Sequence, residues 1–321
     1  MADNNSNNIY LSPGPHFSGS IKSNMIMLMV VISLLPECVM GVIYFGLPAL
    51  ITILASVASC VVFEAIFQKL IKRPVSVGDF SAVVTGVLLA LTLPPTMPVW
   101  QTVLGAFFAI VVAKGLFGGL GCNVWNPALT GRAFLFVSFP TAMGSAWVTP
   151  FDAVSTATPL AKPEAYTDLW QLFTGAHAGS IGETCIIAIL GSALFLLITH
   201  VIDWRAPLTM VATACLCTFL ANRFDVNAVL FALTTGGLLF GATFMVTDYT
   251  TAPLTGAGRL IFGAGCGLIT FLIRQYGGFP EGVMFSILIM NSLVPFLNKI
   301  SRRKYGYGLK KDKASKEGAQ K

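Results

Sequence analysis

The chain has 321 residues, of which 55% are hydrophobic and only 11% are charged. In soluble domains about a quarter of all residues are charged. The composition therefore excludes a protein with a fully solvated surface and indicates an integral membrane protein surrounded by lipid. The net charge is +6, and residues 299–321 hold nine of the twenty Lys and Arg residues. Because no basic face interleaved with aromatic residues occurs elsewhere, we expect no nucleic-acid partner.

The first part of the chain holds a polar segment, 1–24, followed by five apolar segments. A bilayer core of about 30 Å needs roughly 20 apolar residues per helix, so 25–44 and 47–70 are predicted to be complete spans. The next three segments are shorter and end at Pro or Gly residues; they lie at 81–93, 99–113 and 126–140. Broken helices are tolerated in a membrane where they are buried in protein or line a cavity.

A long polar connection, 141–181, separates these segments from five more. The later segments lie at 183–201, 207–221, 226–246, 260–273 and 282–297. The sequence therefore predicts an all-α polytopic membrane protein. It has about ten transmembrane segments within 25–298, followed by a basic tail at 299–321.

The distribution of positive charges predicts the orientation in the membrane. If both termini are cytoplasmic, seventeen of the twenty Lys and Arg residues lie on the cytoplasmic side, and only Lys162, Arg223 and Arg274 lie on the other. Lys and Arg are enriched in cytoplasmic loops. We therefore expect both termini in the cytoplasm and the connection 141–181 outside it.

Two short patterns recur in corresponding places. The pattern A-x-x-T-G-x-L-L occurs at 82–89 and again at 232–239, in the third and eighth segments. Gly118-Gly119, after the fourth segment, is matched by Gly277-Gly278 after the ninth. Repeats of five helices each must have opposite orientations in the membrane. The sequence thus predicts an inverted 5+5 repeat with discontinuous helices.

The polar connection contains the run D-A-V-S-T-A-T, from Asp152 to Thr158. From its residue types alone, this run is either a loop in which an Asp caps a turn or an accessible hydroxyl for covalent modification. It resembles the flavinylation motif D-x-x-S-G-A-T of the RnfD/NqrB family, which implies FMN attached to Thr158 through a phosphoester bond. Asp152, Ser155 and Ala157 match the motif, whereas Thr156 stands where the family has Gly.

A second G-A-T sequence, Gly241-Ala242-Thr243, competes for the modification. It lies in an apolar segment with no Asp at the motif distance, so we expect the flavin transferase to modify Thr158 instead. Further blocks are similar to the same family in the same order. They read S-A-V-V-T-G-V-L-L-A-L-T-L-P-P at 81–95, G-G-L-G-C-N-V-W-N-P at 118–127 and F-M-V-T-D-Y-T-T-A-P at 244–253.

The resemblance implies a urea-transporter-like fold and a flavin-carrying membrane subunit of an Rnf-type ferredoxin:NAD oxidoreductase in the bacterial inner membrane. In such a complex, electron transfer between ferredoxin and NAD is coupled to translocation of Na+ or H+. The chain would act with other membrane and peripheral subunits, including a second covalent-flavin subunit, and it would not be active alone. It contains no dinucleotide-binding fingerprint, so NAD is expected on another subunit.

Three alternatives remain open from the sequence. An NqrB-type subunit of the sodium-pumping NADH:quinone oxidoreductase is similar, but such subunits carry a longer N-terminal extension than this chain does. A urea-channel-like solute transporter would also contain inverted repeats with broken helices. A structural subunit without flavin is consistent with Thr156 in the motif.

The Gly-rich stretch between the fourth and fifth segments contains Asn123, Trp125 and Asn126. The resemblance implies that these residues hold a second, non-covalent flavin such as riboflavin, since amides bind the edge of an isoalloxazine and Trp stacks on its face. The competing interpretation is that Asn126, followed by Pro127, caps the fifth segment.

Ionisable residues within or beside membrane segments are candidates for an ion pathway, because burying a charge in the membrane is unfavourable. Asp79 and Asp248 lie at the ends of the third and eighth segments, and Glu37 follows Pro36 within the first. Asp79 could instead cap a helix N-terminus. The His and Cys residues show no metal-ligand spacing, so we expect no metal site and no catalytic side chain.

Overall fold

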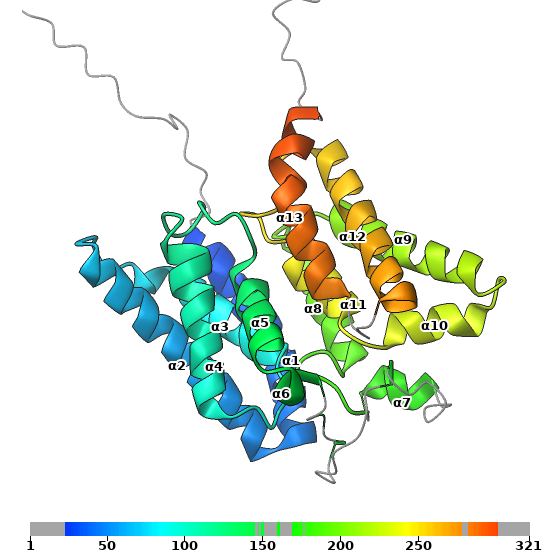
Figure 1. Cartoon of the computed structure of the whole chain (residues 1–321), viewed down its shortest axis with the longest axis horizontal. Coiled ribbons are helices and arrows are strands. Elements are labelled where there is room, and N and C mark those ends of the chain that lie inside the picture. The colour runs from blue at the N-terminus through cyan, green and yellow to red at the C-terminus, as the bar shows by residue number, and fades with distance from the viewer. Residues whose placement is uncertain are drawn as a thin grey trace, which may run out of the picture.

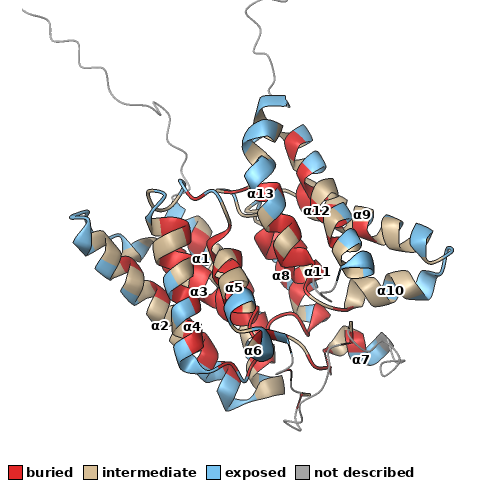
Figure 2. Cartoon of the chain, viewed as in Figure 1, coloured by how far each residue is buried: buried red, intermediate tan, exposed pale blue. Residues whose placement is uncertain are grey.

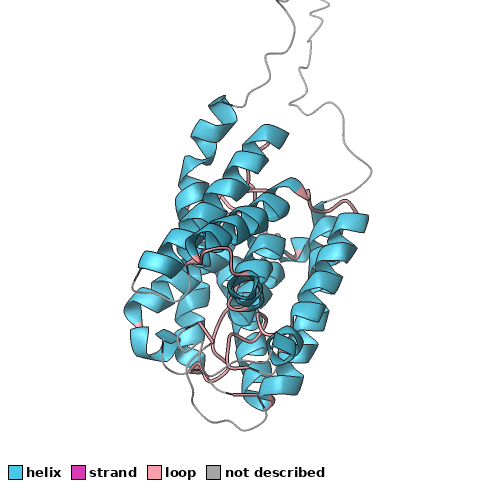
Figure 3. Ribbon diagram, turned by 90° about the vertical axis from the view of Figure 1, so that its right-hand side faces the viewer, coloured by secondary structure: helices cyan, strands magenta, loops and turns pink. Residues whose placement is uncertain are grey.

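The computed structural model describes residues 23–144, 147, 149–150, 159–160, 169–175, 177–277 and 282–300. Every regular element in this part of the chain is a helix (Figure 3). The predicted flavin-attachment residue Thr158 and its motif partners Asp152, Ser155 and Ala157 lie outside the described residues. So do most of the polar segment 1–24 and nearly all of the basic tail.

The first half of the chain forms a set of packed helices (Figure 1). They are α1 (Ser23–Phe45), α2 (Leu47–Leu70), η1 (Val77–Asp79), α3 (Ser81–Leu91), α4 (Val99–Phe107), the π-helical η2 (Phe108–Gly115), α5 (Pro127–Ser138) and α6 (Pro140–Gly144). Helix α2 contacts both α3 and α4, and α5 packs against α4 and η2.

The second half forms a comparable set beside the first (Figure 1). It consists of α7 (Leu169–Thr174), α8 (Ile186–Ile198), α9 (Arg205–Ala221), α10 (Val226–Thr234), α11 (Leu238–Phe240), the π-helical η4 (Gly241–Met245), α12 (Gly256–Tyr276) and α13 (Val283–Ile300). Helix α9 packs extensively on α12, and α12 on α13. Contacts between the halves join α1 to α8 and α5 to α13.

Helices lie in all ten segments that the sequence predicted, but their lengths differ widely. In the described residues, α1, α2, α12 and α13 are long and apolar enough to cross a membrane, and a fifth span results if α10 and α11–η4 count as one bent pair. The remaining apolar helices have 10–17 residues. The structure is therefore consistent with a polytopic membrane protein.

The short helices are broken by residues with unusual backbone conformations. Helix α3 begins after Phe80, which adopts the left-handed conformation with φ 61°. The eighth segment breaks at Thr235–Gly237, where Gly236 has φ +67° and the helix axis bends by 66°. Glycine adopts a positive φ without steric strain. The segments that follow these two breaks, α3 and α11–η4, are almost completely buried.

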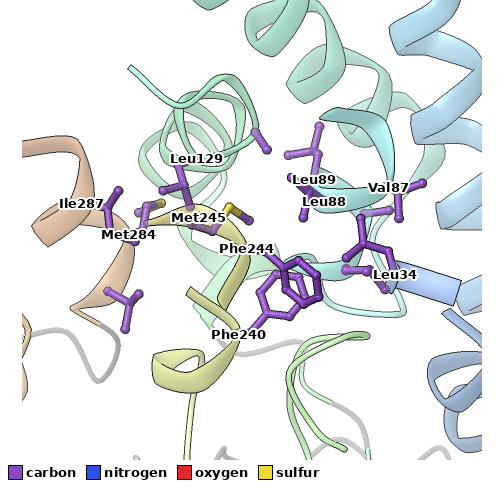
Figure 4. Packing of buried hydrophobic residues seen from close by; sticks show 14 of the residues in the cluster. Leu34, Val87, Leu88, Leu89, Leu129, Phe240, Phe244, Met245, Met284 and Ile287 are labelled. Atoms are coloured by element: carbon purple, nitrogen blue, oxygen red, sulfur yellow. The ribbon is translucent and has the colours of Figure 1, made fainter. Parts of the chain in front are cut away.

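The core lies where the two halves meet. Buried residues concentrate on α3, on α11 and on the inward faces of the surrounding helices (Figure 2). Leu34 of α1 and Leu88 of α3 lie near Phe240 and Phe244 of the second half (Figure 4). Outward faces instead expose large apolar side chains such as Leu54 on α2, as expected where lipid replaces water.

Candidate flavin and ion sites

A cavity of about 80 Å³ lies between α1, α3, α8 and the segment after η4. Its lining brings together residues from distant parts of the chain: Ser81, Lys114, Asn123, Asn126 and Asp248. Three of these, Asn123, Asn126 and Asp248, were predicted from sequence for two separate roles. We call this cavity the central cavity.

The two asparagines of the Gly-rich stretch line the central cavity and also have structural roles. Asn126 Oδ1 accepts a hydrogen bond from the Leu129 backbone N–H at 3.3 Å, so it is the N-cap of α5. Asn123 Nδ2 donates to Thr250 Oγ1 at 2.9 Å and links this stretch to the second half. The capping interpretation of Asn126 is therefore confirmed.

Trp125 does not line the central cavity. Its indole Nε1 donates to Ser292 Oγ of α13 at 2.8 Å, and its ring lies edge-on to Phe117 with 6.0 Å between centroids. The Trp125 side chain thus connects the Gly-rich stretch to α13. Stacking of Trp125 on a flavin beside Asn123 stays a prediction; in the structure the indole contacts Phe117 and Ser292.

Asp248 and Asp79 both bind nearby polar groups. Asp248 accepts hydrogen bonds from the Thr250 backbone at 3.1 Å and from the hydroxyls of Thr250 and Thr251. Asp79 Oδ1 accepts from the backbone N–H and the hydroxyl of Ser81, at 2.8 and 2.6 Å. Asp79 therefore binds the first backbone N–H of α3 from the residue before the N-cap, Phe80, so it contacts this helix N-terminus, as its alternative interpretation predicted. Asp248 stabilises the turn after η4.

A buried ion pair that was not assigned a role from sequence lies beside these carboxylates. Lys114 Nζ lies 2.7 Å from Glu64 Oε1 and 2.6 Å from Ser81 Oγ. Both charged side chains are almost completely buried. Through Ser81, the ammonium group is connected to Asp79. The sequence signal that could have indicated this pair is one acidic residue inside the second apolar segment and one basic residue directly after the fourth.

Arg132 and Glu183 form a second buried ion pair, 3.0 Å apart, and Ser180 donates to the other Glu183 oxygen at 2.7 Å. Charge counting had placed Lys114 and Arg132 at the cytoplasmic side. Because both side chains are buried among helices, neither should be counted among the positive charges of the cytoplasmic loops. The remaining charges still favour the same orientation.

Glu37 lies in α1, is only 1% exposed, and neither carboxylate oxygen has a hydrogen-bond partner among the described residues. It does not line the central cavity. Of the three ion-pathway candidates from sequence, only Asp248 lines the central cavity. Asp79 is connected to its wall through Ser81, whereas Glu37 lies elsewhere on α1.

A larger cavity of about 700 Å³ lies between α9, α10 and α12. Leu160, two residues after Thr158, is part of its wall, as are Asn227 and Arg274. We call it the outer cavity. Pockets for ligands of drug size have volumes of about 300–1,000 Å³, so the volume of the outer cavity lies within this range, whereas that of the central cavity lies below it.

Comparison with known proteins assigns the chain to a family. A model of the NQR2, RnfD, RnfE family matches residues 10–306. The chain belongs to this family. It is 42% identical over 314 residues to the D subunit of the Na(+)-translocating ferredoxin:NAD(+) oxidoreductase complex of Acetobacterium woodii, covering 95% of this chain and 97% of that protein.

Other members of the family are similar over comparable lengths. The D subunit of the proton-translocating ferredoxin:NAD(+) oxidoreductase complex of Clostridium ljungdahlii is 38% identical over 312 residues, covering 91% of this chain and 94% of the relative. The D subunit of the ion-translocating oxidoreductase complex of Stutzerimonas stutzeri is 39% identical over 324 residues, covering 88% and 91%. The resemblance predicted from short sequence blocks is thereby confirmed at the level of the family.

Proposed function

We propose that this chain is the D-type membrane subunit of an ion-translocating ferredoxin:NAD oxidoreductase. The observation that carries the proposal is its similarity, along 95% of its length, to a D-type subunit of such a complex. The apolar helices and buried charged pairs described above are consistent with a membrane subunit. A solute channel is the weaker candidate, because the similar proteins are named as oxidoreductase subunits.

In this function the chain acts within a complex in the bacterial inner membrane, beside the subunits that bind ferredoxin and NAD. Both termini face the cytoplasm, and the connection 141–181 faces outward. The first residues of α1 and the last residues of α13 lie toward the same edge of the helix assembly (Figure 1), which supports placing both termini on one side.

The proposed cofactor is FMN, attached to Thr158 by a flavin transferase. FMN supplies reversible one- and two-electron chemistry, and a covalent link prevents its loss from the outer face. The competing Thr243 is only 6% exposed within η4, so a transferase could not reach it in the folded chain. Asn123, Asn126 and Asp248 offer amide and carboxylate groups for the edge of a partly enclosed riboflavin.

The decisive test is intact-mass analysis of the denatured chain, purified from cells that contain the flavin transferase. We expect an added FMN phosphoester mass that disappears in Thr158→Ala and persists in Thr156→Ala, which alters the neighbouring threonine of the same motif. An unmodified wild-type chain, or an adduct that persists in Thr158→Ala, contradicts the proposal.

The proposed architecture is an inverted repeat of two five-segment halves. In the first half, α2 contacts α3 and the α4–η2 segment; in the second half, α9 likewise contacts α10, η4 and α12. The contacts α1–α8 and α5–α13 join elements that occupy equivalent places in the two halves. Such pairing is expected around a pseudo-twofold axis in the membrane plane.

For ion movement, the proposed route passes Asp248 and Asp79 near the central cavity, with Glu37 as a separate buried carboxylate on α1. The cavity carries both signs of charge, since Lys114 and Asp248 line it. Buried carboxylates within membrane segments are the usual sites of cation passage. Asp248→Asn in the complex is expected to reduce ion uptake into vesicles more than it reduces electron transfer.

A further inference from the structure

The two halves of the chain meet along one face of α1. Ser192 Oγ of α8 donates a hydrogen bond to the Ser33 backbone carbonyl at 2.5 Å. Two turns further along α1, a Cβ atom built on Gly41 would lie 2.7 Å from the carbonyl oxygen of Ile181. Residues four apart lie on the same face of a helix, so Glu37 lies between these two contacts. We call the contact of Ser33, Glu37 and Gly41 with Ile181 and Ser192 the α1–α8 seam.

Glu37 is buried in the α1–α8 seam without a counter-charge. Its side chain is only 1% exposed, and neither carboxyl oxygen has a hydrogen-bond partner among the described residues. The sequences of α1, α3 and α8 contain no Lys, Arg or His. The other titratable groups on the elements that contact this part of α1 are three thiols and two carboxylates that already have a basic partner. They are Cys38, Cys60, Cys185, Glu64 with Lys114, and Glu183 with Arg132.

The hydrogen bonds around Glu37 favour the protonated form of its carboxyl group. An ionised carboxylate is very unfavourable in an apolar interior unless it is paired or accepts hydrogen bonds, whereas a protonated carboxyl group is neutral and has an O–H donor. Ser192 is the polar side chain beside Glu37. It gives its single hydroxyl hydrogen to Ser33, so its oxygen is free to accept a hydrogen bond and has no hydrogen left to donate.

The surroundings of Glu37 do not suit a metal cation. Hard metal cations are held by several oxygen ligands and need room for them, but Glu37 lines neither the central cavity nor the outer cavity. The nearby oxygens of Ser33 are already bonded, since its hydroxyl donates to the Val30 carbonyl at 2.7 Å and its carbonyl accepts from Ser192. A proton needs no cavity and only one acceptor.

We propose that Glu37 is a proton-binding residue, which holds one proton in the α1–α8 seam and donates it to Ser192 Oγ. Ser192 in turn donates to the Ser33 carbonyl, so a chain of hydrogen bonds joins the two halves. In the proposed ion route this assigns Glu37 to H+ and excludes a metal cation there, and the protonation itself does not depend on that route or on a flavin.

Release of the proton is coupled to opening of the α1–α8 seam. When the proton passes to water, it leaves a carboxylate without a partner between apolar helices, which is unfavourable until water reaches it. Pro36 directly precedes Glu37 within α1. Proline has no backbone N–H for the helical hydrogen bond and weakens a helix at that turn. The helix is therefore weakest beside the residue that would need to reach water.

The test uses the full chain, purified in detergent and treated with dicyclohexylcarbodiimide, an apolar reagent for protonated carboxyl groups. The carboxyl O–H adds across one C=N bond of the reagent, and the product rearranges to a stable N-acylurea. The mass therefore rises by one whole reagent molecule and nothing is released. Glu37→Gln removes the reactive group, but its amide can still donate to Ser192. Asp203→Asn makes the same chemical change at a partly exposed carboxylate outside the seam and serves as the matched control.

We expect an adduct that peptide mass spectrometry maps to Glu37 in wild type and in Asp203→Asn, and no adduct on this peptide in Glu37→Gln. Replacement of choline chloride by sodium chloride at constant pH should leave the labelling unchanged. Protection of Glu37 by sodium ions overturns the proposal, because the residue would then bind a metal cation.

Infrared spectroscopy decides the protonation state if the reagent does not reach the seam. The carbonyl stretch of a protonated carboxyl group should appear in the difference between wild type and Glu37→Gln, and a difference without that band contradicts the proposal. Ser192→Ala should shift the band to higher frequency, because the carboxyl group loses its acceptor; an unshifted band contradicts the hydrogen bond to Ser192. Neither readout involves a flavin, so the outcome is independent of the FMN mass that tests the proposed cofactor.

Discussion

At the residue scale, Lys114 and Glu64 show how the fold tolerates charges inside a membrane protein. The two side chains lie 2.7 Å apart with almost no exposure to solvent, and Ser81 accepts a further hydrogen bond from the ammonium group. A buried pair is weakly stabilising as a whole, but removal of one partner leaves an uncompensated charge, which costs about 3–5 kcal/mol.

Lys114→Met is therefore expected to lower the melting temperature of the purified chain in detergent by several degrees. The double variant Glu64→Met/Lys114→Met should recover much of this loss, because apolar side chains of similar size replace both charges. Thermal unfolding followed by circular dichroism measures both effects. If the double variant is less stable than Lys114→Met, the destabilisation does not arise from an unpaired Glu64.

Asp203, in the connection between α8 and α9, provides a second test at this scale. Partial burial would raise its pKa, but hydrogen bonds from the Arg205 backbone at 3.0 Å and from Arg259 at 2.6 Å, with both guanidinium charges, hold the pKa below its usual value. A lowered pKa contributes stability above the unfolded-state pKa, and this stability is lost as the pH falls through the folded-state pKa.

Asp203→Asn is thus expected to destabilise the chain at pH 7 by about 1 kcal/mol, because the pair is partly solvated. The difference in melting temperature between the variant and wild type should shrink as the pH is lowered below about 4, the usual pKa of Asp. A difference that stays constant down to pH 3 would show that the carboxylate charge is not involved.

At the scale of elements, the contact between α2 and α3 depends on the absence of a side chain at Gly86. A Cβ atom there would lie only 2.7 Å from Val57 Cα. The close approach also allows Ser56 Oγ to donate to the Gly86 carbonyl at 2.7 Å. Small residues allow close helix approach and interhelical hydrogen bonds inside membranes.

Gly86→Ala is expected to destabilise the chain by about 1–3 kcal/mol, since an added methyl group must displace backbone. Gly191→Ala is the matched control: Gly191 lies in helix α8 with no atom within 4 Å of an added Cβ. That control should be neutral or slightly stabilising, because Ala has the higher helix propensity. Equal effects in the detergent melting assay would show that α2 and α3 do not approach closely at Gly86.

At the scale of the whole molecule, the orientation in the membrane determines which cavity faces which compartment. Cys122 is the exposed thiol among the seven cysteines, and the predicted topology places it on the cytoplasmic side. Gln171 is an exposed residue of α7, within the connection predicted to lie outside.

A maleimide that does not cross membranes should therefore label Cys122 in inverted vesicles and not in intact spheroplasts. The double variant Cys122→Ser/Gln171→Cys should show the opposite pattern. The single variant Cys122→Ser is the blank. Mass spectrometry of the labelled chain reads out both. Labelling of the two sites from the same side would contradict the predicted topology.

Much of the helical organisation could be predicted from sequence, because an apolar run of sufficient length has few other structures in a bilayer. The cap of α5 by Asn126 and the contact of Asp79 with the N-terminus of α3 were also predictable, since such contacts involve neighbours within three residues. The orientation of Trp125 was not, because its partner Ser292 is 167 residues away in the chain.

The sequence by itself determined that this protein belongs in a membrane, where its helices lie, and which family its motifs resemble. Each of these depends on composition or on residues close together along the chain. Only the tertiary structure decided that Lys114 pairs with Glu64 and that Asp248 shares a cavity with Asn123. It also decided that the side chains of Leu160 and Arg274 both lie against Gly236. Such contacts depend on how broken helices fold back between long ones, and no local pattern encodes that arrangement.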